Sequence, residues 1–140
     1  MIRDFTELKV WQEAHKLTLA VYKTTRSFPR EEKFGVVSQL QRAASSVPAN
    51  IAEGFARKSI NELLRSLGIA SGSLAEARYF LLLSRDLGYL NGNVLRALQS
   101  QCESVAQLIN ALARSLRQRA QHKVQGTRHK VRSPKLGGDL

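Results

Sequence analysis

The stretch RAASSVPANIAEGFARKS, residues 42–59, places a proline and a glycine inside a segment whose pattern is otherwise helical. It also carries alanine, serine, asparagine and glutamate where a core-facing helix of a leucine-rich chain would carry leucine. The distance between packed helices depends on the side chains at their contact, so small residues allow a close approach. An active site, a close helix contact and a binding surface are the three roles that such a stretch can have.

Apolar residues at spacings of three and four run through this stretch, which predicts a helix that begins upstream of it. They are Phe34, Val37, Leu40, Ala44, Val47, Ile51 and Phe55. Pro48 removes one backbone hydrogen bond and crowds the carbonyl of Ala44, so we expect a kink there and not an end. We expect the helix to weaken at Gly54 because glycine is a poor helix former.

Three further helices are predicted, over residues 5–25, 59–87 and 93–119. Asp4 with Glu7, and Ser59 with Glu62, have the spacing of capping boxes, and Asn93 is the expected N-cap of the last helix. The third helix carries a near-heptad stripe and should stop at Gly88. That stripe consists of Leu63, Leu67, Ala70, Leu74, Ala77 and Leu81.

Four helices joined by short connections predict an all-α fold, an antiparallel up-down-up-down four-helix bundle. The apolar period ends at Arg119, and the rest is rich in charge with Gly, Pro and Ser. We therefore expect a bundle over residues 1–119 and a disordered basic C-terminal tail over residues 120–140.

A second run of small residues, GIASGSLAEAR over residues 68–78, predicts that the third helix packs closely on the second. On this interpretation, leucine in place of Gly72 or Ser46 should destabilise the fold strongly. We expect a buried polar network at this contact that fixes the helix register. Its members are Arg42, Ser46, Asn50, Glu53 and Glu76.

The net charge of +11 is distributed unevenly along the chain. Residues 1–113 contain 14 Lys and Arg against 10 Asp and Glu, whereas residues 114–140 contain 8 against 1. Such an asymmetry favours nucleic acid as the partner, through phosphate contacts of weak sequence specificity, although a tail that only aids solubility is the alternative. The predicted nucleic-acid-binding residues are Arg114, Arg117, Arg119, Lys123, Arg128, Lys130, Arg132 and Lys135, with a weaker patch at Arg57, Lys58 and Arg65.

Other function classes have less support in the sequence. Glu53 and Glu76 are a conceivable acid and base, but no nucleophile, metal-ligand spacing or phosphate loop accompanies them, so we expect no enzyme, no metal and no cofactor. Cys102 falls at a core-type helical position and is expected to be a buried hydrophobe. No membrane span or export signal is evident, which favours a cytoplasmic protein.

Three segments of the chain together resemble the four-helix-bundle proteins encoded in intervening sequences of large-subunit ribosomal RNA genes. They are LKVWQEAHKLTLAVYKTTRSFPREEKFG (8–35), QLQRAASSVPANIAEGFAR (39–57) and IASGSLAEARYFLLLSRDLGYL (69–90). The resemblance covers about residues 5–116, and its SVPANIAEG core is highly specific.

This resemblance implies an antiparallel four-helix bundle and assembly into a ring-shaped homopentamer. The family's function is largely undefined. A more distant relative is the accessory variability determinant of diversity-generating retroelements, a basic pentameric bundle that binds a reverse transcriptase and nucleic acid. Two functions are therefore expected: a homopentamer that binds nucleic acid, with RNA favoured, or a protein-interaction scaffold such as an accessory subunit of a reverse transcriptase.

Overall fold

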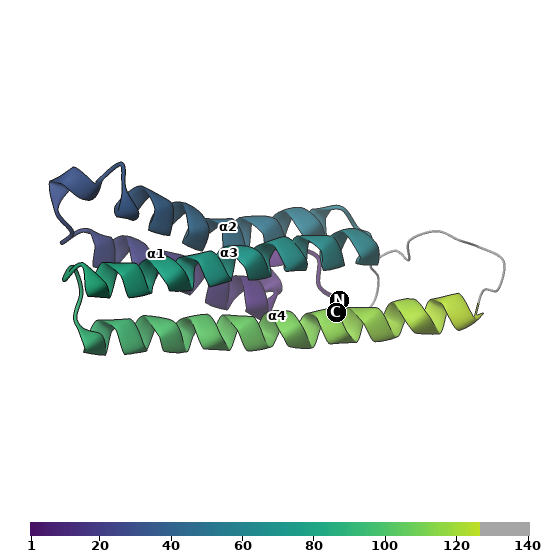
Figure 1. Cartoon of the computed structure of the whole chain (residues 1–140). Helices are drawn as coiled ribbons and strands as arrows, with labels where there is room; N and C mark the ends of the chain where they lie inside the picture. The colour runs from purple at the N-terminus through teal and green to yellow at the C-terminus, as the bar shows by residue number, and fades with distance from the viewer. Residues whose placement is uncertain (127–140) are drawn as a thin grey trace.

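The computed structural model describes residues 1–126, with side chains described as far as Lys123, and this part of the chain is all-α. Four long helices run alternately up and down (Figure 1), which confirms the predicted bundle. They are α1 Lys9–Thr25, α2 Val36–Ala56, α3 Ile60–Asp86 and α4 Gly92–Gly126, with two short 3-10 helices, η1 Phe5–Glu7 and η2 Arg30–Glu32.

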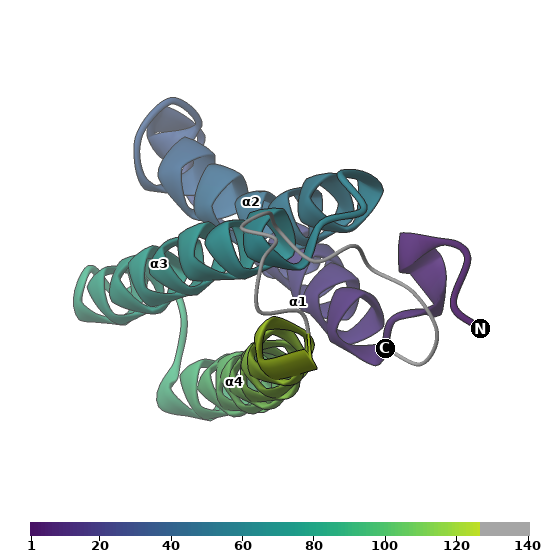
Figure 2. The same ribbon diagram turned by 90° about the vertical axis from the view of Figure 1, so that its right-hand side faces the viewer.

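The hydrophobic core runs along the bundle axis between the four helices. Leu17, Leu40, Leu67 and Leu116, one from each helix, are all 1% exposed or less. Helix α1 packs on α2 and α4, and α3 packs on the same two helices, so α1 and α3 stand diagonally opposite across the core (Figure 2). The predicted apolar stripe of α3 is buried along its whole length, as expected.

Helices α2 and α3 form the most extensive contact, which confirms the predicted pairing of their small-residue runs. A Cβ atom on Gly54 would lie 2.5 Å from the Cβ of Ser66, closer than real Cβ atoms approach. Gly54 is thus a close-contact residue, and the helix continues past it to Ala56. The expectation for Gly72 is wrong, because a Cβ there meets nothing within 4 Å: this glycine lies on the solvent side of α3.

The backbone of α2 passes through Pro48 without a break. Proline has no N–H, so the carbonyl of Ala44 loses its helical partner. The Thr18 hydroxyl, on α1, donates to that carbonyl over 3.0 Å and also lies 3.0 Å from the carbonyl of Ala14 in its own helix. The buried Ala44 carbonyl, which has no N–H donor from Pro48, therefore accepts a hydrogen bond from a hydroxyl of the neighbouring helix.

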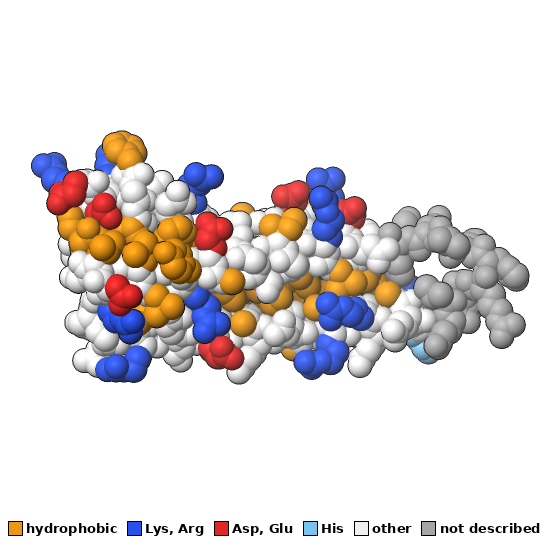
Figure 3. Space-filling model, in the orientation of Figure 1, with side chains coloured by type: hydrophobic (Ala, Val, Ile, Leu, Met, Phe, Trp, Pro, Cys, Tyr) orange, Lys and Arg blue, Asp and Glu red, His pale blue; other side chains and the backbone are white. Residues whose placement is uncertain are grey.

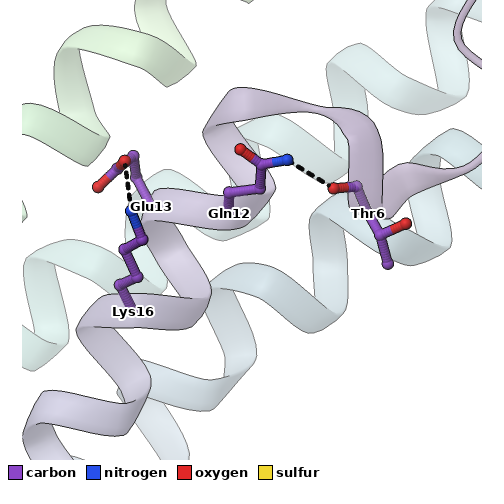
Figure 4. Close-up of polar contacts among 4 residues, drawn as sticks. All are labelled: Thr6, Gln12, Glu13 and Lys16. Carbon is purple, nitrogen blue, oxygen red and sulfur yellow. Dashed lines mark hydrogen bonds and ion pairs between the residues drawn. The ribbon is translucent and has the colours of Figure 1, made fainter.

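The capping box of Asp4 and Glu7 is present, but it caps η1 and not α1. Leu8 is extended between the two, so the expected single helix from residue 5 is divided. The Gln12 side chain then donates to the Thr6 carbonyl over 2.8 Å and ties η1 back to α1, next to an exposed pair of Lys16 and Glu13 (Figure 4).

Helix α2 begins at Val36, later than the apolar period suggested. The expected core position of Phe34 is wrong, since its side chain is 88% exposed while that of Val36 is 5% exposed. The chain between η2 and α2 is not helical, so the 3.6-residue period does not extend back to Phe34.

The turn between α3 and α4 has the expected glycine stop. Gly88 has φ +83°, its N–H donates to the Arg85 carbonyl, and the N–H of Tyr89 donates to the Ser84 carbonyl. This is the hydrogen-bond pattern of a Schellman motif. The N-cap of α4 is Asn91, whose side chain accepts from the Val94 N–H over 2.9 Å, and not Asn93 as expected.

Helix α4 continues to Gly126, beyond the expected end at Arg119. The stretch RAQHKVQ after Gln118 carries no apolar stripe, but Ala, Gln, Arg and Lys are good helix formers. An existing helix adds residues more cheaply than a new one nucleates, which accounts for the extension. Within the described part of the chain, no helix combines the length and the apolar character needed to cross a membrane.

Candidate nucleic-acid interface

The last turns of α4 concentrate the cations that the structure describes at one end of the bundle. Arg114, Arg117 and Lys123 are exposed, and Arg119 is half-buried. Glu103 is the last acidic residue of α4, so no carboxylate on this helix competes for them. On the face shown in Figure 3, the side chains over the C-terminal half of α4 include Lys or Arg but no Asp or Glu.

Four of the predicted binding residues, Arg128, Lys130, Arg132 and Lys135, lie outside the residues that the structure describes. The other four lie on α4. Helix α4 projects beyond the first turn of α3 at this end (Figure 1), and Arg114 and Arg117 form no ion pair with a described residue.

The weaker patch at the turn between α2 and α3 lies at the same end of the bundle. Arg78 of α3 donates to Gln99 of α4 over 3.1 Å, an exposed contact that shows the antiparallel register of the two helices. In that register Arg114 and Arg117 are level with the first turn of α3, and Arg65 follows one turn later. The two basic regions therefore adjoin.

Within this second region the cations differ in environment. Arg57 lies 3.4 Å from the Glu53 carboxylate in an exposed pair one helical turn apart. Lys58 closes the turn with φ +55°, a left-handed conformation that is uncommon for a residue with a Cβ. Lys58 and Arg65 are exposed and are the cations of this patch that face solvent without an ion-pair partner among the described residues.

The predicted polar network exists only in part. Asn50 donates to the Ser46 carbonyl and to its hydroxyl, over 2.8 and 2.9 Å. The Ser46 and Ser73 hydroxyls are 2.9 Å apart and join α2 to α3. Ser73 was missing from the prediction, although its place in the small-residue run at 68–78 was a usable signal.

Arg42, Glu53 and Glu76 correct the prediction of a buried network, because all three are exposed. Arg42 and Glu76 line a shallow hollow of about 270 Å³ together with Ser46 and Ser73, whereas Glu53 pairs with Arg57. The contact of Ser46 with Ser73 places Glu53 and Glu76 about ten residues apart in axial level, roughly 15 Å along the helices. The two carboxylates do not share a site.

The single cysteine of the chain lies in the core, as expected. Cys102 is a free thiol, fully buried, and burial raises its pKa from 9.0 to about 11. Among the described residues, no cluster of three His, Cys, Asp or Glu side chains is placed to hold a metal ion.

An antiparallel four-helix bundle with a basic helix end is therefore the class of protein that the fold and this surface define. The chain belongs to the 23S rRNA-intervening sequence protein family, whose model matches residues 6–111. The matched segment ends before Arg114, so the basic end of α4 lies outside it.

A solved structure has the same fold. It is the crystal structure of a protein of unknown function from the S23 ribosomal protein family of Bacteroides thetaiotaomicron. The two chains are 20% identical with a TM-score of 0.70, and the match covers 75% of this chain and 95% of the other. No curated protein matches this chain.

Proposed function

We propose that this chain is a non-enzymatic, cytoplasmic RNA-binding protein, assembled as a homopentamer, that contacts phosphate groups through the end of α4 and the residues after it. The observation that carries the proposal is the charge of residues 114–140, 8 Lys and Arg against 1 acidic residue. The first half of this segment is helical, and Arg114 and Arg117 are exposed on either side of Leu116, the last buried core residue of α4.

The mode of binding follows from the side chains at this end of the molecule. Cations neutralise phosphates and release counterions, which gives affinity without reading sequence. Base stacking needs exposed aromatic side chains at the binding surface. The exposed aromatic residues are Tyr22, Phe34 and Tyr79, and none belongs to α4. We therefore propose recognition of the phosphate backbone, with weak preference among sequences.

RNA is favoured over DNA because the family description refers to 23S rRNA. A non-enzymatic role is supported by the separation of Glu53 from Glu76 and by their exposure to solvent. Assembly into a pentamer follows the family resemblance. Five copies would each contribute a charge of +11, and a ring would gather the α4 ends of all copies at the same level.

The proposal is tested by RNA binding of the full chain over a salt series from about 50 to 200 mM, with duplex DNA as the second probe. The double variant Arg114→Gln/Arg117→Gln should flatten the slope of log affinity against log salt by about 0.7–0.9 for each phosphate that the protein no longer neutralises. Arg30→Gln/Arg96→Gln is the matched control, because it removes the same charge from exposed residues at the other end of the bundle.

Equal effects of the two double variants would show that net charge, and not the α4 end, governs binding. No RNA binding at about 50 mM salt would sink the proposal. That result would favour the alternative function, a scaffold that binds another protein such as a reverse transcriptase. The exposed apolar side chains of α1 and α3 are the observation that favours that alternative.

A further inference from the structure

Among the residues whose side chains the structure describes, large hydrophobic side chains are exposed on two of the four helices only. Among the described residues, α2 and α4 expose none, whereas α1 and α3 each expose several. They are Leu19 (56%) and Tyr22 (44%) on α1, and Ile69 (46%), Tyr79 (57%) and Leu82 (41%) on α3, with Leu87 (49%) directly after it. Apolar side chains also gather over the C-terminal half of α3 in the surface view (Figure 3).

The exposed residues repeat at helix spacing, which makes each set one face of its helix. The outer face of α1 consists of Gln12, His15, Leu19, Tyr22 and Arg26, at steps of three and four. The outer face of α3 consists of Gly68, Gly72, Ala75, Tyr79 and Leu82, at steps of four and three. Helix α3 thus has a near-heptad stripe toward the core and another toward solvent, a pattern suited to helix packing on both sides.

The two outer faces lie on opposite sides of the molecule, because α1 and α3 are diagonal in the bundle (Figure 2). They also differ in shape. The α1 face has the large side chains Leu19 and Tyr22, whereas part of the α3 face is Gly68 and Gly72, above which there is open space. One copy can therefore place the α1 face on the α3 face of the next copy.

Charge favours the same pairing. Lys23 is exposed beside Arg26 of the α1 face, whereas Glu76 and Arg78 are exposed on the two sides of the α3 face. None of the four forms an ion pair with a described residue. Contact of one α1 face with another α1 face would bring cations together, whereas the charges beside the α3 face are of both signs and Glu76 can pair with a cation of α1.

We propose that the chain self-associates head to tail, the outer face of α1 in one copy docking on the outer face of α3 in the next. Such a contact is heterologous, and repetition closes into a ring or continues as a filament. The inference rests on the self-association in the proposed function and goes beyond it by assigning both surfaces.

The test measures the mass of the full chain and of three variants by light scattering after gel filtration. Leu19→Asp/Tyr22→Asp disables the α1 face, Tyr79→Asp/Leu82→Asp disables the α3 face, and Phe34→Asp is a control at an exposed apolar residue outside both. We expect an assembly for the wild type and the control, and a monomer of 15.6 kDa for each double variant. Mixing the two double variants should give a heterodimer, because each retains one intact face.

The milder Leu19→Gln and Tyr79→Gln variants replace any double variant whose circular dichroism departs from that of the wild type. A wild-type mass retained by the face variants would overturn the assignment of surfaces while the proposed assembly stands. Monomers that do not recombine on mixing would overturn the head-to-tail arrangement. A monomeric wild type would overturn both inference and assembly, and RNA binding measured alongside would report separately on the α4 end.

Discussion

At the scale of single residues, one hydroxyl accounts for a proline in the middle of a helix. Thr18 reaches from α1 to the Ala44 carbonyl that Pro48 leaves without an N–H partner. Hydrogen-bonding groups that are buried and unpaired cost about 1–3 kcal/mol. The proline and the threonine therefore act as a pair, although they lie on different helices.

Thr18→Val should lower the free energy of unfolding by about 1–3 kcal/mol, because valine keeps the shape and removes the donor. Pro48→Ala restores an N–H to α2, so the same Thr18→Val change should cost less in that background. Urea denaturation of the four chains of this double-mutant cycle measures the coupling. Equal costs in both backgrounds would disprove the pairing.

Gly54 allows α2 and α3 to approach closely, because it has no side chain at their contact. Gly54→Ala places a methyl group 2.5 Å from the Ser66 Cβ and should destabilise the protein by about 1–3 kcal/mol, as overpacking does. Gly68→Ala is the matched control when both changes are made in the Leu19→Asp/Tyr22→Asp background, whose α1 face cannot cover Gly68 of another copy. Its methyl group then enters open space, and alanine favours the helix by about 1 kcal/mol. Chemical denaturation should therefore move the two midpoints in opposite directions.

At the scale of elements, Cys102 reports on the docking of α4. Its thiol is buried, and its pKa lies at about 11 in place of 9.0. The folded state thus holds the proton where the unfolded state loses it. The contribution to stability is complete below pH 9 and is lost as the pH rises toward 11.

We expect a thiol-reactive dye at about pH 8 to label Cys102 only as fast as α4 opens, so that labelling accelerates with urea. The free energy of unfolding should fall more steeply from pH 9 to pH 11 in the wild type than in Cys102→Ala, which lacks the thiol. Rapid labelling in native buffer would contradict the burial of this face of α4.

At the scale of the whole molecule, charge and core are separated along the chain. The last core residue of α4 is Leu116, and the densest run of cations lies beside and beyond it. We therefore expect stability and the proposed phosphate binding to depend on different parts of α4. The two properties should respond to truncation separately.

A chain of residues 1–123 keeps Arg119 and Lys123 and removes four Lys and Arg, whereas a chain of residues 1–117 removes six. RNA affinity at about 100 mM salt should fall in two steps, and the slope against log salt should become flatter in each. The 1–123 chain should unfold within about 0.5 kcal/mol of the full chain, because it retains every described core residue. Full RNA affinity in the 1–117 chain would exclude residues 118–140 from the binding surface.

Much of the fold was predictable from local pattern. The buried stripe of α3 from Leu63 to Leu81, the glycine stop at Gly88 and the pairing of α2 with α3 were all expected and observed. Helix boundaries were less predictable, because the 3-10 helix η1 replaces the expected first turn of α1, and α2 begins only at Val36, after η2. Short 3-10 turns share the capping residues of α-helices, so sequence alone does not separate them.

The sequence by itself determined the helices, the core stripes, the family and the basic end, because apolar period and charge are properties of neighbouring residues along one chain. Only the tertiary structure decided that Gly54 faces a partner helix while Gly72 faces solvent, that Thr18 completes the helix of Pro48, and that Arg42 and Glu53 stay exposed. Both sides of α3 repeat at heptad spacing, so periodicity does not tell the inner side from the outer one. The rotation and axial register of each helix against its neighbours determine which side is buried. Both depend on contacts between residues far apart in sequence.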